Sequence, residues 1–183
     1  MAWAFQDNVI GRPALTAKDT ATSQVIGATT VTTPPWRLGD IASIWDPTYG
    51  AGEAIYLKGV ASNFIGALVT YVNNTGTTAL STTSGVATGG APLAVSLTTA
   101  TETQYAWFQI AGDAVLYKTA VKVDPASGSR VMLSATAGRV MQASVAGRQV
   151  LGARFASLTT VTSTTSTAIV TLNRPVQKSG SAV

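Results

Sequence analysis

Short apolar runs, broken by glycine or aspartate after about five to ten residues, constrain this chain more than any other feature. Beyond the amino-terminal part, no apolar stripe with the spacing of an amphipathic helix persists for more than two turns. Strict two-residue alternation is found instead, as where Ile41 and Trp45 alternate with Ala42 and Ile44. Short strands with turns at regular spacing favour a β-sandwich, a jelly-roll-like fold or a barrel. The sequence therefore predicts an all-β protein with a single such domain.

Hydroxyl groups, rather than charges, make the chain polar. Its 28 threonines and 15 serines outnumber the 20 residues of Asp, Glu, Lys and Arg, and β-branched threonine suits a pleated, half-exposed surface. There is no cysteine and no histidine, which excludes disulfides, thiolate metal sites, cysteine nucleophiles and histidine bases. We therefore expect no catalytic residue, no metal and no cofactor, that is, a protein that is not an enzyme.

The first 37 residues differ from the rest of the chain. Trp3, Phe5 and Trp36 stand singly among polar residues, and a threonine-rich run, TTVTTPP, occupies 29–35. This pattern is typical of an extended arm whose isolated aromatic side chains are buried on another surface. The alternative is an amino-terminal strand that packs into the same domain. The predicted organisation is an arm over 1–37, a β-domain over 38–176 and a short tail over 177–183.

The most aromatic stretch, TQYAWFQIAGDAVLYK, occupies residues 103–118. Alternation places Phe108 and Ile110 on one face of a strand and Tyr105 and Trp107 on the other. Large rings on both faces predict a strand buried on two sides, by the core on one side and by a loop or another subunit on the other. The Ala-Gly-Asp sequence at 111–113 predicts a bend in this strand.

Charge is distributed unevenly along the chain. Residues 1–113 hold four basic and seven acidic side chains, whereas 114–183 hold eight basic and one acidic. The basic residues are spread over many predicted strands, without the clustered footprint of a nucleic-acid-binding protein. They either form a surface for an acidic partner or serve solubility and protect strand edges. Direct binding of nucleic acid is not expected.

Three carboxylates lie close together in the sequence, at Asp40, Asp46 and Glu53. Two carboxylates at a suitable separation are all that a glycosidase needs. Asp46, however, precedes a proline in a predicted turn, where aspartate is favoured because it accepts backbone hydrogen bonds. No compact loop of alternating aspartates is present for calcium. We expect structural roles for these carboxylates, with a hydrolase as a rival hypothesis.

A resemblance to a known family is carried by four segments, which read RLGDIASIWDPTYGAGEAIYLKGVASNFIGALVTY, YAWFQIAGDAVLYKTAVK, AGRVMQASVAGRQVLGARFA and AIVTLNRP. Over 37–176 the chain resembles the small decoration, or cement, proteins encoded in head-gene clusters of tailed bacteriophages. The resemblance implies an all-β protein that binds the outside of an icosahedral shell as a small oligomer and bridges neighbouring major capsid subunits. The resemblance implies no catalytic residues.

The resemblance and the residue patterns together predict the partners. These are the major capsid protein and the chain itself, as a homodimer or a trimer, on the exterior of a virion capsid after synthesis in the host cytoplasm. On a symmetric capsid lattice, many weak contacts together give high avidity. Binding of this kind suits a protein that stays attached and catalyses no reaction. No apolar run approaches the length of a membrane span, so no membrane partner is expected. The residues expected to contact the capsid or another subunit are Trp3, Phe5, Trp36, Trp107, Arg130, Arg139, Arg148 and Arg154.

A second functional class stays open beside the capsid hypothesis. A carbohydrate-binding or tail-fibre-type adhesion module would use an exposed aromatic ring as a stacking ledge for sugars. Trp107, Tyr105 and Trp45 are the candidate rings for this role.

Overall fold

The computed structural model describes residues 3–7, 9–26, 29–83, 90–119, 123–124, 130–142, 148–157 and 159–178, with residues 23–32 described by their backbone alone. These residues form strands, turns and bends but no helix, which confirms the predicted all-β class. Accordingly, no described segment is an apolar helix of membrane-spanning length. The strands are β1 (Ala4–Phe5), β2 (Asp19–Thr20), β3 (Thr22–Ile26), β4 (Thr29–Thr33), β5 (Ile41–Asp46), β6 (Gly50–Lys58), β7 (Leu68–Tyr71), β8 (Thr78–Leu80), β9 (Leu93–Ser96), β10 (Gln104–Tyr117), β11 (Arg130–Leu133), β12 (Val140–Met141), β13 (Gln149–Phe155) and β14 (Thr167–Gln177).

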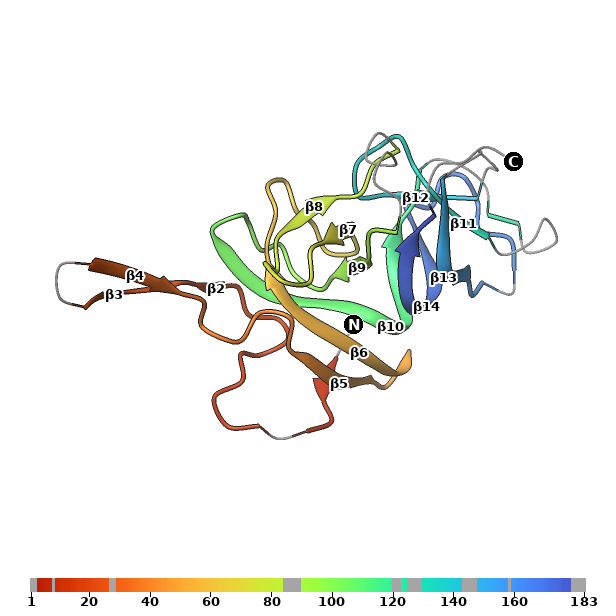
Figure 1. The fold of residues 1–183 in the computed structure, drawn as a ribbon. Coiled ribbons are helices and arrows are strands. Elements are labelled where there is room, and N and C mark those ends of the chain that lie inside the picture. Colours follow the sequence, from red (N-terminus) through yellow and green to blue (C-terminus); the bar gives the residue numbers. More distant parts are fainter. Residues whose placement is uncertain are drawn as a thin grey trace.

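Twelve of these strands belong to one antiparallel sheet, and β3 and β4 form a separate pair (Figure 1). The main path of the large sheet runs β1-β5-β6-β10-β14-β13-β11-β12, and β2, β7, β8 and β9 join it at the side. The path ends at β1 on one side and at β12 on the other, so the sheet is open. Of the architectures expected from the sequence, the structure agrees with a sandwich-like domain rather than a closed barrel.

The long strand β10 joins two halves of the molecule. Its first part, residues 105–109, pairs with β6, whereas residues 111–117 pair with β14. We call β1, β5, β6 and the first part of β10 the amino half. The second part of β10 with β14, β13, β11 and β12 is the carboxy half.

The small group of β7, β8 and β9 lies between the two halves. In β7 and β9, Val69 and Ala94 are register partners and belong to the same apolar cluster as Phe108 of the amino half. Their neighbours Leu68 and Val95 belong instead to the cluster of the carboxy half. Because side chains alternate along a strand, this group of strands covers a face of each half. The arrangement is consistent with a sandwich-like domain.

The other face of the amino half is covered by the first residues of the chain. Trp3, Phe5 and Trp36 are partly buried and pack on a cluster that contains Tyr56 and Trp107, both fully buried. The two faces predicted for β10 are thus confirmed, with Phe108 in one cluster and Trp107 in the other. The cover over the second face comes from the same chain.

The bend predicted in β10 is confirmed by a register shift between Gln109 and Ala111. At the bend Gly112 has a φ of +89°, and a Cβ atom there would lie 2.5 Å from the carbonyl oxygen of Ala51. The Gln109 Nε2 atom donates hydrogen bonds to the carbonyls of Ala111 and Asp113, at 3.1 and 3.0 Å. A glycine is therefore required where β10 turns from one half into the other.

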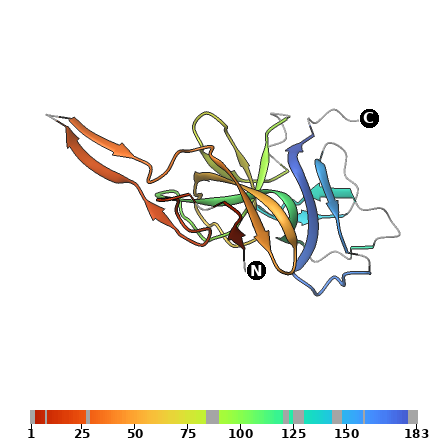
Figure 2. The ribbon, with the colours of Figure 1, turned by 90° about the horizontal axis from the view of Figure 1, so that it is seen from below.

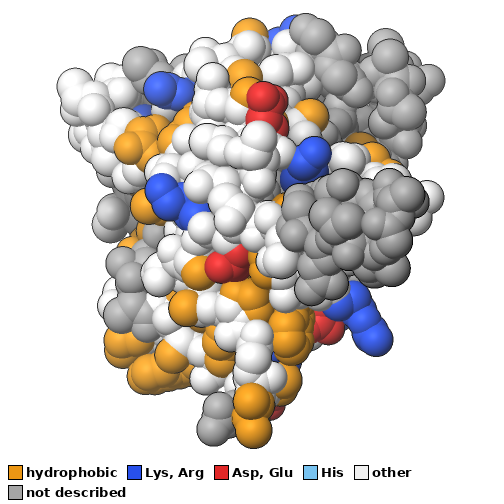
Figure 3. Space-filling model, turned by 90° about the vertical axis from the view of Figure 1, so that its left-hand side faces the viewer, with side chains coloured by type: hydrophobic (Ala, Val, Ile, Leu, Met, Phe, Trp, Pro, Cys, Tyr) orange, Lys and Arg blue, Asp and Glu red, His pale blue; other side chains and the backbone are white. Residues whose placement is uncertain are grey.

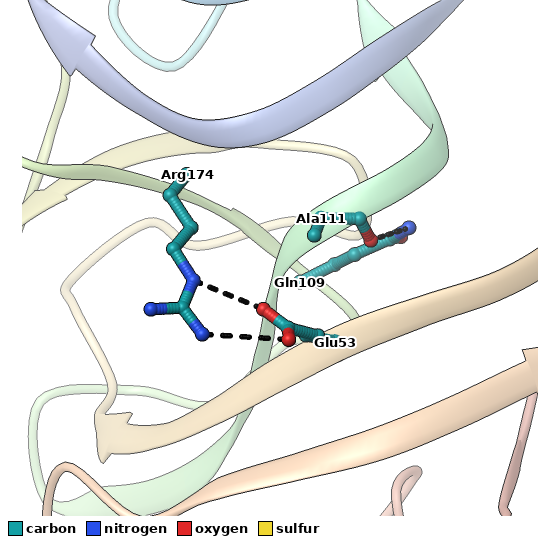
Figure 4. A network of polar contacts seen from close by, with 4 residues as sticks. All are labelled: Glu53, Gln109, Ala111 and Arg174. Atoms are coloured by element: carbon teal, nitrogen blue, oxygen red, sulfur yellow. Dashed lines mark hydrogen bonds and ion pairs between the residues drawn. The ribbon is translucent and has the colours of Figure 1, made fainter.

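An ion pair ties the two halves together beside this bend. Arg174 of β14 reaches the Glu53 carboxylate of β6, with Nε 3.1 Å from Oε2, as Figure 4 shows. Arg174 is exposed and has a φ of +43°, an uncommon backbone conformation for a residue with a side chain. Exposed ion pairs contribute about 0–1 kcal/mol, so this pair adds little to the stability of the fold.

The β3–β4 hairpin projects from the body of the molecule (Figures 1 and 2). The predicted boundary at residue 37 does not separate an arm from a domain, because β1 pairs with β5 and β2 pairs with β10. Among the described strands within 1–37, β3 and β4 alone lie outside the large sheet. The predicted tail at 177–183 begins inside β14, where Gln177 is buried, and residues 179–183 lie outside the described residues.

Candidate functional site

The carboxy half has one face in its core and one face open to solvent. On β10, Ala114 and Leu116 are buried, whereas Asp113 and Val115 are only partly buried. The same alternation continues along β14, where Val170 is buried beside Thr171. Beside Tyr117 this face is covered by the Phe64 ring, which packs edge-on at 5.1 Å. The amino-terminal residues that cover the amino half pack on a separate cluster. The open face is therefore the candidate functional surface.

A row of polar residues crosses four strands on this open face. The register pairs Asp113 with Thr171, Thr171 with Arg154, and Arg154 with Arg130. The Thr171 hydroxyl donates to the Asp113 carboxylate, at 2.6 Å. Hydroxyl and carboxylate thus satisfy each other at one end of the row, and two arginines occupy the other end.

Arg130 and Arg154 lie directly opposite each other, and both are exposed. Within the described part of the chain, neither side chain makes an ion pair or a hydrogen bond. Like charges at directly opposed positions destabilise a sheet. An acidic group bound between the two guanidinium groups would offset this repulsion. The pair is therefore suited to an anionic partner.

The other two arginines of the predicted set lie at different places. The Arg139 guanidinium lies over the Tyr117 ring, 5.6 Å from its centroid, in a cation–π contact. Arg148 immediately precedes β13, and its carbonyl accepts a hydrogen bond of 2.7 Å from the Leu133 amide. Both side chains are partly exposed. Of the four arginines, the structure thus brings together Arg130 and Arg154.

Trp107 is fully buried, which leaves it no surface for a partner. Its indole Nε1 atom donates to the Pro13 carbonyl at 3.0 Å, and the Phe5 ring packs edge-on against it at 5.2 Å. The Arg12 guanidinium lies over the Phe5 ring, 4.9 Å from the centroid. The expectation that Trp107 contacts a capsid or another subunit is therefore wrong for this fold, because Phe5 and Pro13 already cover the ring.

The other aromatic residues of the predicted arm also pack within their own chain. Trp3 stacks against Tyr49, with ring centroids 6.4 Å apart. Trp36 donates from its indole nitrogen to the Asp40 carboxylate at 2.7 Å. Trp3, Phe5 and Trp36 keep some exposed surface, but most of each ring is used inside the protein. The alternative of an amino-terminal strand packed into the domain describes these three residues better than an anchor on a partner.

The three carboxylates of the hydrolase hypothesis have separate structural contacts. Asp40 accepts the hydrogen bond from Trp36, and Glu53 pairs with Arg174. Asp46 is fully buried, and its Oδ1 atom accepts from the amides of Thr48 and Tyr49, at 2.8 and 3.1 Å. This confirms the predicted turn at Asp46. The described residues include no group of three or more carboxylates arranged to hold a metal ion.

A hollow of about 670 Å³ lies at the base of the projecting hairpin. Its lining is mostly apolar and includes Pro34, Pro35, Trp36 and Leu38. Figure 3 looks at this side of the molecule, where hydrophobic side chains gather in the lower part of the view and charged side chains are scattered singly. Neither feature was predicted from the sequence, because the hollow depends on how residues 33–40 fold and the arginine pair depends on the register of β11 and β13.

The chain was compared with known proteins at three levels. No known protein family, no curated protein and no solved structure matches it.

Proposed function

We propose that the protein is a structural virion component that binds the outer surface of a tailed-phage capsid and stabilises neighbouring major capsid subunits. The observation that carries the proposal is the exposed Arg130–Arg154 pair on an open sheet face. Two like charges that face each other in the free protein favour an acidic partner, and under the proposal the major capsid protein provides that acidic surface. The sequence resemblance to phage decoration proteins supplies the class of partner.

Electrostatics on this face would act mainly during docking. Exposed charges steer two surfaces together and raise the association rate more than they slow dissociation. Salt screens them over about 8 Å at physiological ionic strength. Under the proposal the protein acts as a homodimer or trimer on the capsid exterior, is made in the host cytoplasm, and contacts neither nucleic acid nor membrane.

Co-sedimentation with undecorated phage heads tests the proposal. The double variant Arg130→Glu/Arg154→Glu is compared with the wild type between roughly 50 and 500 mM salt, a range that shortens the screening length about threefold. We expect the double variant to bind at least about tenfold more weakly at low salt, mainly through slower association. The matched control is Lys18→Glu/Lys58→Glu, which makes the same change of net charge in the amino half and should bind like the wild type.

Two results would count against the proposal. Absence of co-sedimentation at any salt concentration would remove the capsid as a partner. Equal losses in both double variants would show that net charge matters and that the arginine pair has no special role.

A carbohydrate-binding or adhesion role is the second candidate, and one observation favours it. Trp45 is 47 % exposed on β5, whereas Trp107 is buried and Tyr105 stacks against Tyr56. Of the three candidate ledges, Trp45 offers an open ring for a sugar. Binding on a glycan array that is lost in Trp45→Ala would support this role, and a blank array would remove it.

A further inference from the structure

The β3–β4 hairpin stands apart from the rest of the fold. Its strands pair with each other over five positions, from Thr22 with Thr33 to Ile26 with Thr29, and with no strand of the large sheet. Figures 1 and 2 show it extending away from the body in both views. An isolated two-stranded hairpin is marginally stable in water at best. The hairpin is therefore expected to gain stability from a surface outside its own chain.

The sequence of the hairpin lacks the usual protection of exposed strands. Between Asp19 and Arg37 the chain has no charged residue, and its two prolines come after β4 has ended. Natural proteins protect free strand edges with charges, prolines or bulges, because unpaired backbone groups recruit other strands. Both outer edges of this hairpin are without such devices. The pattern is typical of a segment that becomes covered.

Both ends of the hairpin are fixed to the body. Before it, β2 pairs with β10, and the Asp19 carboxylate accepts a hydrogen bond of 2.9 Å from the Tyr56 hydroxyl. After it, the Trp36 indole is bonded to Asp40. A segment that is held in place before binding loses less conformational freedom on docking. The hairpin is thus presented in a set direction.

The hollow at the hairpin base offers a matching surface. It is lined mainly by the apolar residues Pro34, Pro35, Trp36 and Leu38. Its two charged lining residues, Arg37 and Asp40, are of opposite sign, so the hollow has no net charge, like the hairpin. Two copies of a chain with net charge +4 repel each other, and this repulsion is smallest where neutral surfaces meet. A neutral hairpin against a neutral hollow is therefore a favourable place for self-association.

We propose that the hairpin of one copy lies in the hollow at the hairpin base of a second copy. The hairpin and the hollow are adjacent in the chain of each copy. A two-fold axis that places the first hairpin in the second hollow therefore also places the second hairpin in the first hollow. The two contacts form together, and the exchange closes a dimer instead of an open chain of molecules. The inference deepens the proposed function, on which it rests for its role in bridging capsid subunits, but its test needs no capsid.

Cysteine cross-linking tests the contact directly, because the chain has no cysteine of its own. Thr30→Cys in the hairpin is mixed with a size-tagged Arg37→Cys, in which the new thiol stands at the hollow. We expect a disulfide-linked heterodimer under mild oxidation, at least about tenfold more abundant than for Thr30→Cys mixed with tagged Ser163→Cys. Ser163 is exposed and lies in the carboxy half. Equal yields for the two mixtures would overturn the proposal.

Shortening the hairpin tests its contribution to assembly. Because Thr22 and Thr33 are register partners, residues 23–32 can be replaced by Asn-Gly, which closes a two-residue turn between them. We expect the dimer dissociation constant from sedimentation velocity to rise at least about tenfold, with an unchanged circular dichroism spectrum and urea midpoint. The double variant Val25→Lys/Thr30→Lys keeps the hairpin length, adds charge, and should weaken the dimer in the same direction.

The outcomes separate this inference from the proposed function. A wild type that is monomeric at tens of micromolar, or a shortened variant that dimerises normally, overturns the inference. If the shortened variant dimerises normally but binds phage heads weakly, the hairpin docks on a capsid subunit, and the proposed function stands without the exchange. If dimerisation fails while the salt-sensitive binding to heads persists, both the exchange and the function are supported.

Discussion

The amino and carboxy halves share one strand, β10, but they differ in how its two faces are buried. In the amino half both faces carry large apolar rings, Trp107 on one and Phe108 on the other, and both are fully buried. In the carboxy half Leu116 is buried while Asp113 and Val115 lie on the open face. The first residues of the chain cover the amino half, whereas the open face of the carboxy half is covered beside Tyr117 by the Phe64 ring. On β10, therefore, the face with Trp107 is used inside the chain, whereas the face with Asp113 and Val115 keeps exposed surface for a partner.

The largest effect is expected from removing the cover of the amino half. Deleting residues 1–16 takes away Trp3, Phe5 and Leu15 and exposes the buried rings of Tyr56 and Trp107. At about 1.5–3 kcal/mol for a fully buried side chain, with a discount for the two partly buried ones, we expect a loss of about 4–6 kcal/mol in unfolding free energy. Urea denaturation measures it. A truncated protein with the wild-type midpoint would show that these residues do not belong to the core.

A single substitution beneath that cover should have the next largest effect. Trp107→Ala leaves a cavity under Phe5 and removes the hydrogen bond to Pro13, so we expect a loss of about 3–5 kcal/mol. Trp45→Ala is the matched control: its ring is half exposed on β5, and a change below about 1 kcal/mol is expected. Similar losses at both positions would contradict the assignment of Trp107 to the core.

The bend that separates the halves is tested at Gly112. Gly112→Ala adds a Cβ atom 2.5 Å from the Ala51 carbonyl oxygen, in addition to the strain of a left-handed backbone. Gly50→Ala is the control, since its φ of +78° is similar and no atom lies within 4 Å of the added Cβ. Backbone strain alone costs about 1–2 kcal/mol, and overpacking adds about 1–3 kcal/mol. Equal thermal shifts in the two variants would show that β10 does not need a close approach at the bend.

Alkaline pH should affect the amino half through Tyr56. Burial and the hydrogen bond to the Asp19 carboxylate raise the pKa of Tyr56 far above its ordinary value of 10.0. An unfolded chain ionises this phenol near pH 10 while the folded chain keeps it protonated, so stability is lost as pH rises above that point. Tyr56→Phe should lose about 1 kcal/mol at neutral pH and show a smaller decline between about pH 10 and 11. An unchanged decline in the variant would assign the alkaline effect to other groups.

The smallest effect is expected on the open face of the carboxy half. Arg154→Thr removes the repulsion from Arg130 and places a β-branched residue in β13, so the free protein should be stabilised by up to about 0.5 kcal/mol. The same variant should bind phage heads more weakly under the proposed function. A variant that is less stable than the wild type would indicate that the arginine pair is already balanced within the chain.

The sequence showed which residue types the candidate site contains, but it did not show how they are arranged in the folded sheet. The excess of basic residues after position 113 was visible in the sequence, yet the register that sets Arg130 opposite Arg154 includes irregularities in β11 and in β13. A shift of one residue moves a side chain to the other face of a sheet. Spacing along the sequence carries no information about such shifts, so the pairing appears only in the folded sheet.

The sequence by itself determined the all-β class, the two faces of β10, its bend at Gly112 and the turn at Asp46. These features follow from local chemistry, because alternation, glycine conformations and side-chain hydrogen bonds act within a few residues. The tertiary structure decided which surface covers Trp107, where the hairpin projects and which arginines meet. An aromatic ring gains about the same free energy when it is buried on its own chain or on a partner. The choice between the two depends on contacts between segments far apart in the sequence, such as Phe5 and Pro13 with Trp107.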